Sequence, residues 1–344
     1  MSAARMKAAD PPVPVPRKSG QPGQPESATL AGTPGPTDGG PARVTRKRGA
    51  GPLLPYLLIA PTIVAIGAVF VWPLIKTVIM SFQDVGRREL WTGEAAPWVG
   101  FDQFTNIFAD GDFWDVVWRT VLFMAVCVTA TMGLGLFLSM AMQRMAKGVR
   151  LALTGALVAA WAMPLLVATS IFRWFADSDY GVLNMVLTKY LGLDFRGHNW
   201  WLDPKQGFLI IGAVVVWGAI PFVTITLYAA LTQVPKELEE AASLDGAGAA
   251  GVFRFVTWPV IKPVFQMIAT LSVIWDFNVF GQVFLMRGNK PEPEYNLLGT
   301  YYYEKAFESN SFSQGAAISL ITVLLLSGVA VYYLRQLLKI GEVE

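Results

Sequence analysis

Six long stretches of this chain carry almost no charged side chains, and they constrain the fold more than any other feature. A helix needs about 20 residues to cross the roughly 30 Å hydrocarbon layer of a bilayer, and it satisfies its own backbone groups there. We therefore predict an all-α integral membrane protein with six transmembrane helices. The predicted spans are 53–75, 121–142, 151–172, 208–231, 264–286 and 316–334.

The composition supports a membrane protein and argues against several other classes. Hydrophobic residues make up 53% of the chain and charged residues 15%, while the net charge of +2 is too small to indicate nucleic-acid binding. With one cysteine and one histidine, the chain cannot form an internal disulfide, and a metal site or a Ser-His-Asp triad is not expected. We expect Cys127, in the middle of a span, to be a buried small hydrophobe.

The segment before the first span has a different composition. Residues 1–51 are rich in Pro, Gly, Ser and Thr and nearly lack large apolar side chains, which predicts a disordered tail. The first apolar run starts too late and is too long for a signal peptide. The membrane domain is therefore predicted to be 52–344.

The charges of the loops select an orientation. Lys and Arg close to the span ends gather on one face, whereas the loops of the opposite face are longer and acidic. Since basic residues mark the cytoplasmic side and six spans return the chain to its starting side, we predict that both termini are cytoplasmic. The basic residues are Arg43, Arg46, Lys47, Arg48, Arg144, Lys147, Arg150, Lys236, Arg254, Lys262, Arg335 and Lys339.

Segment 235–263 is the longest amphipathic, charged segment between two spans, and it falls on the predicted cytoplasmic face. Pro235 suits the first position of a helix, and the glutamates after it suit the first turns. Gly246 follows the periodic run, where a helix usually stops. We predict a short helix, a glycine turn and a second short helix entering the membrane, which Pro259 and Pro263 interrupt.

Within this segment, the run Glu240-Ala241-Ala242, three residues, Gly246, nine residues, Val256, one residue and Trp258-Pro259 resembles the EAA loop of ABC-importer permeases. Val256 and Trp258 depart from the Ile and Leu of the family pattern, although both remain apolar. The resemblance implies a loop that docks into a groove on a cytoplasmic ATPase. The implied coupling residues are Glu240, Ala241, Ala242, Asp245 and Gly246.

The glycines of this segment also match G-x-G-x-x-G, at Gly246, Gly248 and Gly251. A dinucleotide site needs a strand before the glycines and an acidic residue about 20 positions after them. A helix-forming run precedes them here, and Asp276 lies within an apolar span. We reject a nucleotide-binding function for this run.

Asp276 is the only charged residue in the middle of a predicted span, and such a charge is functional by default. On a regular helix it shares a face with Ser272, while Asn278 lies about 200° away. We predict that the Ser272 and Asp276 face lines a substrate cavity, with Trp275 as a stacking platform. The alternative is that Asp276 holds helices together through a buried pair or hydrogen bond.

Prolines flanked by aromatic residues occur in the third and fourth spans, at Trp161 to Pro164 and at Trp217 to Phe222. Intramembrane proline frees backbone carbonyls and often lies beside a cavity. From about Leu53 to its end the chain resembles disaccharide-importer permeases, which implies cavity positions for some of these residues. The candidate cavity residues are Asp276, Ser272, Trp275, Trp161, Phe222 and Asn278.

The resemblance, strongest to trehalose-importer permeases of mycobacterial type, implies a non-enzymatic transport subunit in the bacterial plasma membrane. No Walker A motif occurs, so ATP and Mg²⁺ are expected on a separate ATPase and no cofactor on this chain. The implied partners are a second, different permease chain, a cytoplasmic ATPase dimer, an extracytoplasmic substrate-binding protein and membrane lipid.

Three alternatives stay open. A glycerophosphodiester or polyol importer has the same features. A secondary transporter should show ion-coupling residues within the membrane and related halves, and we find one charge and no clear repeat. A membrane-embedded enzyme should show clustered catalytic side chains, and the external acids are scattered without His or Cys.

Overall fold

The computed structural model describes residues 54–341, so the predicted disordered tail at 1–51 lies outside the described residues. The chain divides into two compact units, 1–59 and 60–344, and the packing below is that of the second. Every regular element in the described residues is a helix, and Gln83 and Trp98 form an isolated antiparallel bridge. The predicted all-α membrane fold is confirmed.

Five described helices are long and apolar enough to cross a membrane, and a bent pair of helices would be a sixth span. The five are α1–η1–α2 (Leu54–Ile66, Gly67–Val71, Trp72–Met80), α5 (Gly111–Arg144), α9 (Pro204–Leu231), α11–η2–α12 (Ala249–Val252, Phe253–Thr257, Trp258–Phe277) and α15 (Phe312–Gly341). The bent pair is α6 (Lys147–Trp161) and α7 (Leu165–Phe175). The shorter helices are α3 (Arg87–Thr92), α4 (Asp102–Ala109), α8 (Val182–Leu191), α10 (Lys236–Leu244), α13 (Gly281–Met286), η3 (Pro293–Tyr295), α14 (Leu298–Tyr303) and η4 (Glu304–Glu308).

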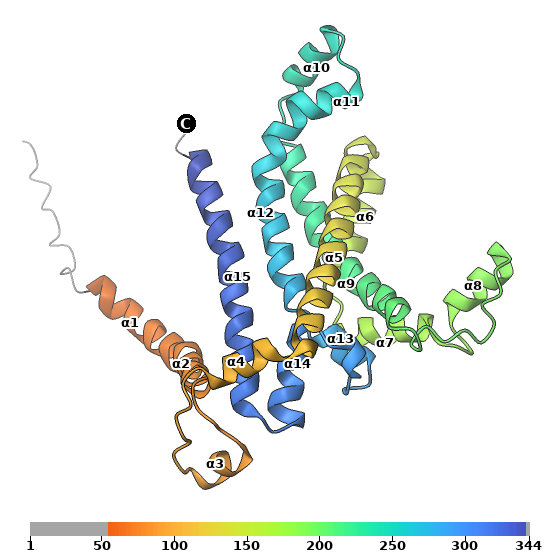
Figure 1. Ribbon diagram of the computed structural model, residues 1–344. Helices are drawn as coiled ribbons and strands as arrows, with labels where there is room; N and C mark the ends of the chain where they lie inside the picture. Colours follow the sequence, from red (N-terminus) through yellow and green to blue (C-terminus); the bar gives the residue numbers. More distant parts are fainter. Residues whose placement is uncertain (1–53, 342–344) are drawn as a thin grey trace, which may run out of the picture. The chain divides into compact units, whose positions relative to one another are not determined.

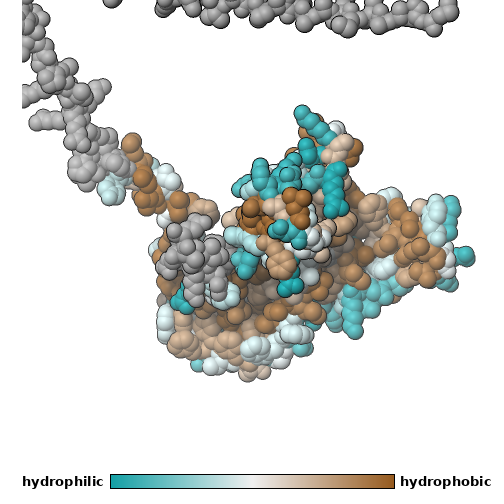
Figure 2. Space-filling view, turned by 90° about the horizontal axis from the view of Figure 1, so that it is seen from above, coloured by the Kyte–Doolittle hydropathy of each residue, from teal (hydrophilic) through white to brown (hydrophobic). Residues whose placement is uncertain are grey.

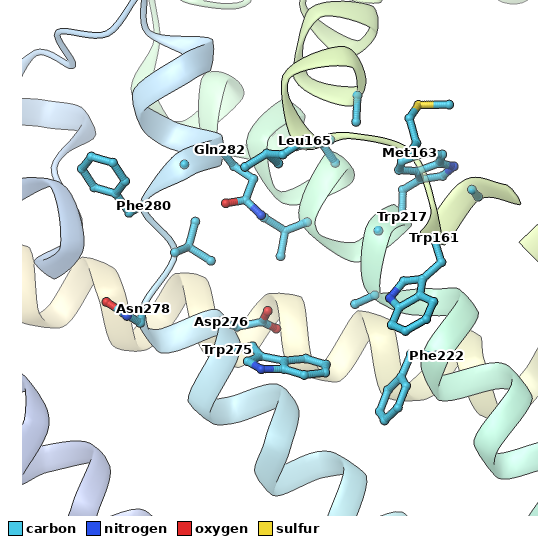
Figure 3. Close-up of a pocket in the computed structure, with 18 residues that line it drawn as sticks. Trp161, Met163, Leu165, Trp217, Phe222, Trp275, Asp276, Asn278, Phe280 and Gln282 are labelled. Carbon is cyan, nitrogen blue, oxygen red and sulfur yellow. The ribbon is translucent and has the colours of Figure 1, made fainter. Parts of the chain in front are cut away.

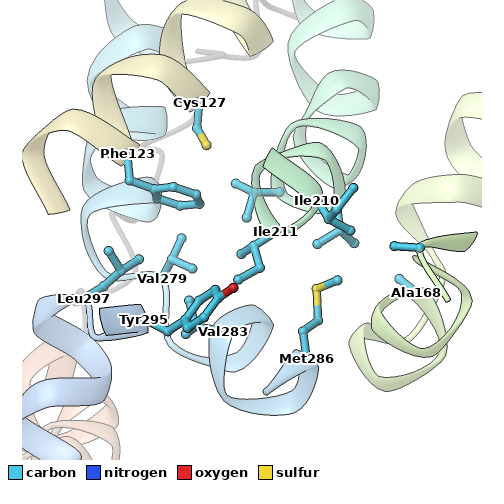
Figure 4. Packing of buried hydrophobic residues seen from close by; sticks show 13 residues of the cluster. Phe123, Cys127, Ala168, Ile210, Ile211, Val279, Val283, Met286, Tyr295 and Leu297 are labelled. Carbon is cyan, nitrogen blue, oxygen red and sulfur yellow. The ribbon is translucent and has the colours of Figure 1, made fainter. Parts of the chain in front are cut away.

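Helices α5, α9 and α12 pack against one another and form the centre of the domain (Figure 1). Their largest buried cluster joins Phe123 and Cys127 of α5 to Ile211 of α9 and to Val283 of α13 (Figure 4). Cys127 is 1% exposed, which confirms the prediction that it is a buried small hydrophobe. The close approach of α5 to α9 depends on Gly135, because a Cβ there would lie 2.5 Å from Val223 Cγ1.

Gly135→Val is expected to destabilise the domain by about 1–3 kcal/mol, since the added side chain overpacks the α5–α9 contact. Thermal unfolding of the purified protein in detergent should show a lowered midpoint. The control is Gly133→Val in the same helix, where a Cβ has open space around it. Equal midpoints for the two variants would contradict a tight α5–α9 contact at Gly135.

The two ends of the domain differ in the helices and in the side chains that they carry. Helices α10 and α11 and the α5–α6 turn lie at one end, and α3, α4 and α14 lie at the other (Figure 1). Viewed from the α10–α11 end, hydrophilic side chains gather over that end, with apolar side chains around it (Figure 2). The basic residues of the α5–α6 turn and of α10 to α12 therefore lie at the end opposite the acidic residues of α4, η3 and η4 (Figure 1).

The third apolar stretch differs from the prediction of one span at 151–172. It is broken between Trp161 and Leu165, and α6 and α7 meet at 100°. Pro164 explains the break, because proline disfavours helical geometry in the residue before it and lacks the N–H that a continuing helix needs. Its own extended backbone (ψ 138°) starts α7 in a new direction.

The fifth stretch also differs from the predicted span at 264–286. One continuous helix runs from Ala249 to Phe277, and neither Pro259 nor Pro263 interrupts it. A π-helical turn at Phe253–Thr257 precedes Pro259, with the Trp258 N–H donating to the Phe253 carbonyl, and this wider turn accommodates the proline. The helix ends at Phe277, and α13 starts separately at Gly281.

Candidate functional site

A pocket of about 480 Å³ lies where the chain breaks twice, beside the α6–α7 bend and the α12–α13 break, with α9 as its third wall (Figure 3). The regular helix ends at each break. Backbone groups and side chains can therefore face the pocket there, whereas a continuous helix would hydrogen-bond that backbone internally or turn those side chains toward lipid. The lining residues that carry aromatic or polar groups are Trp161, Trp217, Phe222, Trp275, Asp276, Asn278, Phe280 and Gln282.

Three aromatic rings from three helices form one end of the pocket. The ring centroids of Trp161 and Phe222 are 6.4 Å apart at an interplanar angle of 27°, and those of Phe222 and Trp275 are 5.5 Å apart at 63°. Trp161 and Trp275 remain 59% and 47% exposed, so both side chains are accessible at the surface of this chain. Exposed aromatic faces of this kind stack on the apolar faces of sugar rings and also pack readily against lipid or a partner helix.

The polar groups of the pocket are Asp276, Asn278 and Gln282. In the view of Figure 3, Asp276 lies between the aromatic end and the Asn278 and Phe280 end. Asp276 is 4% exposed, and its Oδ2 has no hydrogen-bond partner among the described residues. The suggested alternative, a helix-holding contact through this atom, therefore finds no partner in the described part of the chain.

Five of the six candidate cavity residues line this one pocket: Trp161, Phe222, Trp275, Asp276 and Asn278. Ser272 does not line it; it lies one turn before Asp276 and is 2% exposed. We predicted that Asp276 and Asn278 lie on opposite faces of their helix, and this prediction required a regular helix through both residues. Since α12 ends at Phe277, Asn278 is free of the helical periodicity and shares the pocket.

Two residues outside the candidate cavity set, Gln282 and Trp217, also line the pocket. Gln282 lines it because α13 starts a new helix direction, and no local signal placed that break at Asn278. Trp217 lines it from α9, which stays continuous across Pro221. A weak signal existed there, since a proline leaves the carbonyl four residues earlier, that of Trp217, without its helical N–H.

The second candidate site is the elbow, defined here as residues 235–257 at the far end of α12. Helix α10 begins at Lys236, one residue later than predicted, with Pro235 as its N-cap. It ends in a Schellman motif: the Ala247 N–H donates to the Ala242 carbonyl at 3.0 Å, and the Gly246 N–H donates to the Ser243 carbonyl at 3.1 Å. Gly246 has φ +91°, which only glycine adopts without strain.

The elbow keeps its shape through contacts between its two arms and presents an open surface. The Thr257 hydroxyl donates to Glu239 Oε1 at 3.0 Å, which ties α10 to the π turn. Leu244 and Phe255 are 89% and 74% exposed, so the elbow presents two large apolar side chains at its surface. The candidate coupling residues Glu240, Ala241, Asp245 and Gly246 are exposed, and Ala242 is half-buried.

The elbow and the pocket are physically connected. The 29-residue helix from Ala249 to Phe277 begins in the elbow and carries Trp275 and Asp276 in its last turn. At 1.5 Å per residue it spans roughly 40 Å. One continuous helix therefore links the elbow to the pocket.

Comparison with known proteins identifies close relatives along most of the chain. The diacetylchitobiose uptake system permease protein DasB of Streptomyces coelicolor is 37% identical over 310 residues, which cover 89% of this chain and 94% of that protein. The sulfoquinovosyl glycerol transport system permease protein SmoG of Agrobacterium fabrum is 30% identical over 82% of this chain and 90% of that protein. The trehalose/maltose transport system permease protein MalF of Thermococcus litoralis is 28% identical over 82% and 92%.

A solved structure has the same fold. The crystal structure of a bacterial ABC transporter involved in the import of the acidic polysaccharide alginate contains a chain that superposes with a TM-score of 0.71 at 20% identity, over 82% of this chain and 94% of that chain. Residues 132–339 match the family "Binding-protein-dependent transport system inner membrane component". The chain thus belongs to this family and is a multi-pass inner membrane permease of a binding-protein-dependent transport system.

Proposed function

We propose that this chain is the membrane-spanning permease subunit of an ATP-driven importer for a neutral sugar of about disaccharide size. One observation carries the proposal: a single helix joins an exposed elbow to a pocket that combines aromatic faces with hydrogen-bonding side chains. The relatives that are named after diacetylchitobiose and trehalose/maltose support a disaccharide. Trehalose is one member of this class.

In the proposed mechanism, the elbow docks on a cytoplasmic ATPase through Glu240, Ala241, Ala242, Asp245 and Gly246. Closure of the ATPase on ATP moves the elbow, and α12 carries that movement to the pocket. The pocket then changes its access from one side of the membrane to the other. A second permease chain would complete the cavity, and this chain itself binds neither ATP nor a metal. Both termini and the elbow are cytoplasmic in this proposal, as the distribution of Lys and Arg favours.

The charge of the pocket favours a neutral solute over a phosphodiester. Its lining contains one ionisable side chain, Asp276, and no Lys or Arg. A buried carboxylate repels an anion and costs desolvation energy unless it is hydrogen-bonded. Sugar hydroxyls can donate to Asp276, and the side-chain amides of Asn278 and Gln282 can both donate and accept.

The test is purification of the tagged chain in mild detergent, followed by identification of the subunits and solutes that belong to it. We expect an ATPase to co-purify, and we expect ATP hydrolysis to rise when an extracytoplasmic binding protein loaded with trehalose or diacetylchitobiose is added. Solute accumulation by vesicles that hold this chain without an ATPase would refute the proposal in favour of a secondary transporter. Labelling of residues 237–263 from the outer surface would refute the proposed orientation.

A further inference from the structure

A second, smaller pocket of about 250 Å³ lies at the end of the molecule opposite the elbow, and the transport mechanism does not use it. We call it the acidic pocket and define it by Asp112 and Asp115 at the start of α5, Glu294 of η3 and Glu304 of η4. Segments far apart in the sequence thus bring four carboxylates around one hollow. Because it faces away from the elbow, it is extracytoplasmic if the proposed orientation holds.

None of the four carboxylates forms a salt bridge within the described residues, although the charges of Asp115 and Glu294 act on Arg119. Arg119 lines the pocket, but its Nη1 donates to the backbone carbonyls of Pro293 and Asn296, each at 3.0 Å. Lys305 approaches Asp110 instead, at 4.0 Å. Glu292, two residues before Glu294, shows the contrast: Arg287 forms a bidentate pair with it at 2.9 and 2.6 Å, and this hydrogen bonding lowers the pKa of Glu292.

A second and independent observation points to a ligand. Asn296 lines the pocket and is 2% exposed, yet its Oδ1 has no hydrogen-bond partner among the described residues. Its Nδ2 is already used, donating to Glu304. A buried amide oxygen without a donor is unfavourable, so a ligand that donates a hydrogen bond to it would remove that cost.

The chemistry of the site selects the ligand. Carboxylates and an amide oxygen accept hydrogen bonds, and four carboxylates against two basic side chains leave a net negative charge. A bare metal ion fits poorly, because no three acidic, His or Cys side chains of the described residues converge at metal-binding distance. Carboxylates spread around a hollow suit a polyatomic cation whose several N–H groups point in different directions, as in arginine and lysine side chains.

We propose that the acidic pocket receives an arginine or lysine side chain of the extracytoplasmic binding protein when it docks on this permease. The inference rests on the proposed function, since it names the contact through which the solute-loaded partner engages this chain. Family membership supplies the partner, because transport by this family depends on a binding protein. Charge complementarity of this kind sets the orientation and rate of docking and weakens with salt.

The test uses the complete importer in lipid nanodiscs and, as the probe, the solute-loaded binding protein that stimulates its ATPase. The double variant Asp115→Asn with Glu294→Gln is expected to raise the Kd for the binding protein about tenfold at low salt, and to flatten the dependence of Kd on salt. Glu308→Gln is the matched control, because Glu308 is exposed on the same η4 segment but does not line the pocket. It should leave both quantities unchanged.

Charge reversal identifies the partner residue. Glu294→Lys is expected to weaken docking further, and one Arg→Glu or Lys→Glu change in the binding protein should restore it. An unchanged Kd and salt slope in the double variant, with a wild type that responds to the binding protein, would overturn this inference alone. Loss of docking on EDTA with recovery on Ca²⁺ would overturn it in favour of a metal site. A wild-type importer indifferent to every binding protein would overturn the proposed function as well.

Discussion

Gly246→Val is expected to lower solute uptake by at least about tenfold while the protein still inserts into the membrane. Gly246 closes the Schellman motif of the elbow at φ +91°, and a β-branched residue held in that region costs about 1–3 kcal/mol. The end of α10 should unwind or turn elsewhere, which displaces the candidate coupling surface. Uptake into proteoliposomes and ATP hydrolysis by the same preparation measure the effect, and hydrolysis should no longer respond to the binding protein.

The control for this variant is Gly248→Ala two residues later. Gly248 has φ −70°, which alanine adopts freely, and a Cβ there meets nothing within 4 Å. This variant should transport normally. The two variants together therefore distinguish the effect of the backbone conformation at Gly246 from the effect of losing a glycine. Normal uptake by Gly246→Val would mean that the shape of the elbow does not matter for coupling.

Asp276→Leu is expected to weaken the apparent affinity for solute by about 10- to 100-fold without preventing assembly. A hydrogen bond to a charged group contributes about 1.5–3 kcal/mol, and about 1.4 kcal/mol corresponds to a factor of ten. Leucine has a similar branched shape, although it is larger, and it cannot accept a hydrogen bond from a sugar hydroxyl. The measurement is the concentration dependence of solute-stimulated ATP hydrolysis by the reconstituted importer, with co-purification of the partner subunits as the test of assembly.

Two further variants determine what kind of role Asp276 has. Asp276→Asn keeps the acceptor oxygen and should retain most of the affinity for a neutral sugar. Thr322→Val also removes a buried polar group, but the Thr322 hydroxyl is satisfied by the Ile318 carbonyl of its own helix at 2.8 Å, and the residue does not line the pocket. It should leave solute affinity unchanged. An unaltered affinity in Asp276→Leu would return Asp276 to a role in helix packing.

Structural features that depend on residues within one or two helical turns could be predicted from the sequence. The apolar stretches predicted the helices, because lipid leaves the backbone of a spanning segment no other way to satisfy its N–H and C=O groups. The elbow could be predicted for a similar reason, since the glutamates after Pro235 favour a helix start and Gly246 favours a stop. The break at Pro164 carried a local signal too, although its angle of 100° did not.

Local sequence was enough to predict the class of protein, its helices and the form of its elbow, because periodicity, capping and glycine conformation are properties of neighbouring residues. Tertiary packing, by contrast, sets the end of α12 at Phe277 and thereby places Asn278 and Gln282 in one pocket with Asp276. It also decided that Ser272 stays outside that pocket and that carboxylates from α5, η3 and η4 surround another. Inside a bilayer, the place where a helix stops and the direction its side chains face depend on which helices pack beside it. Those contacts join residues more than a hundred positions apart, as Arg119 and Asn296 do.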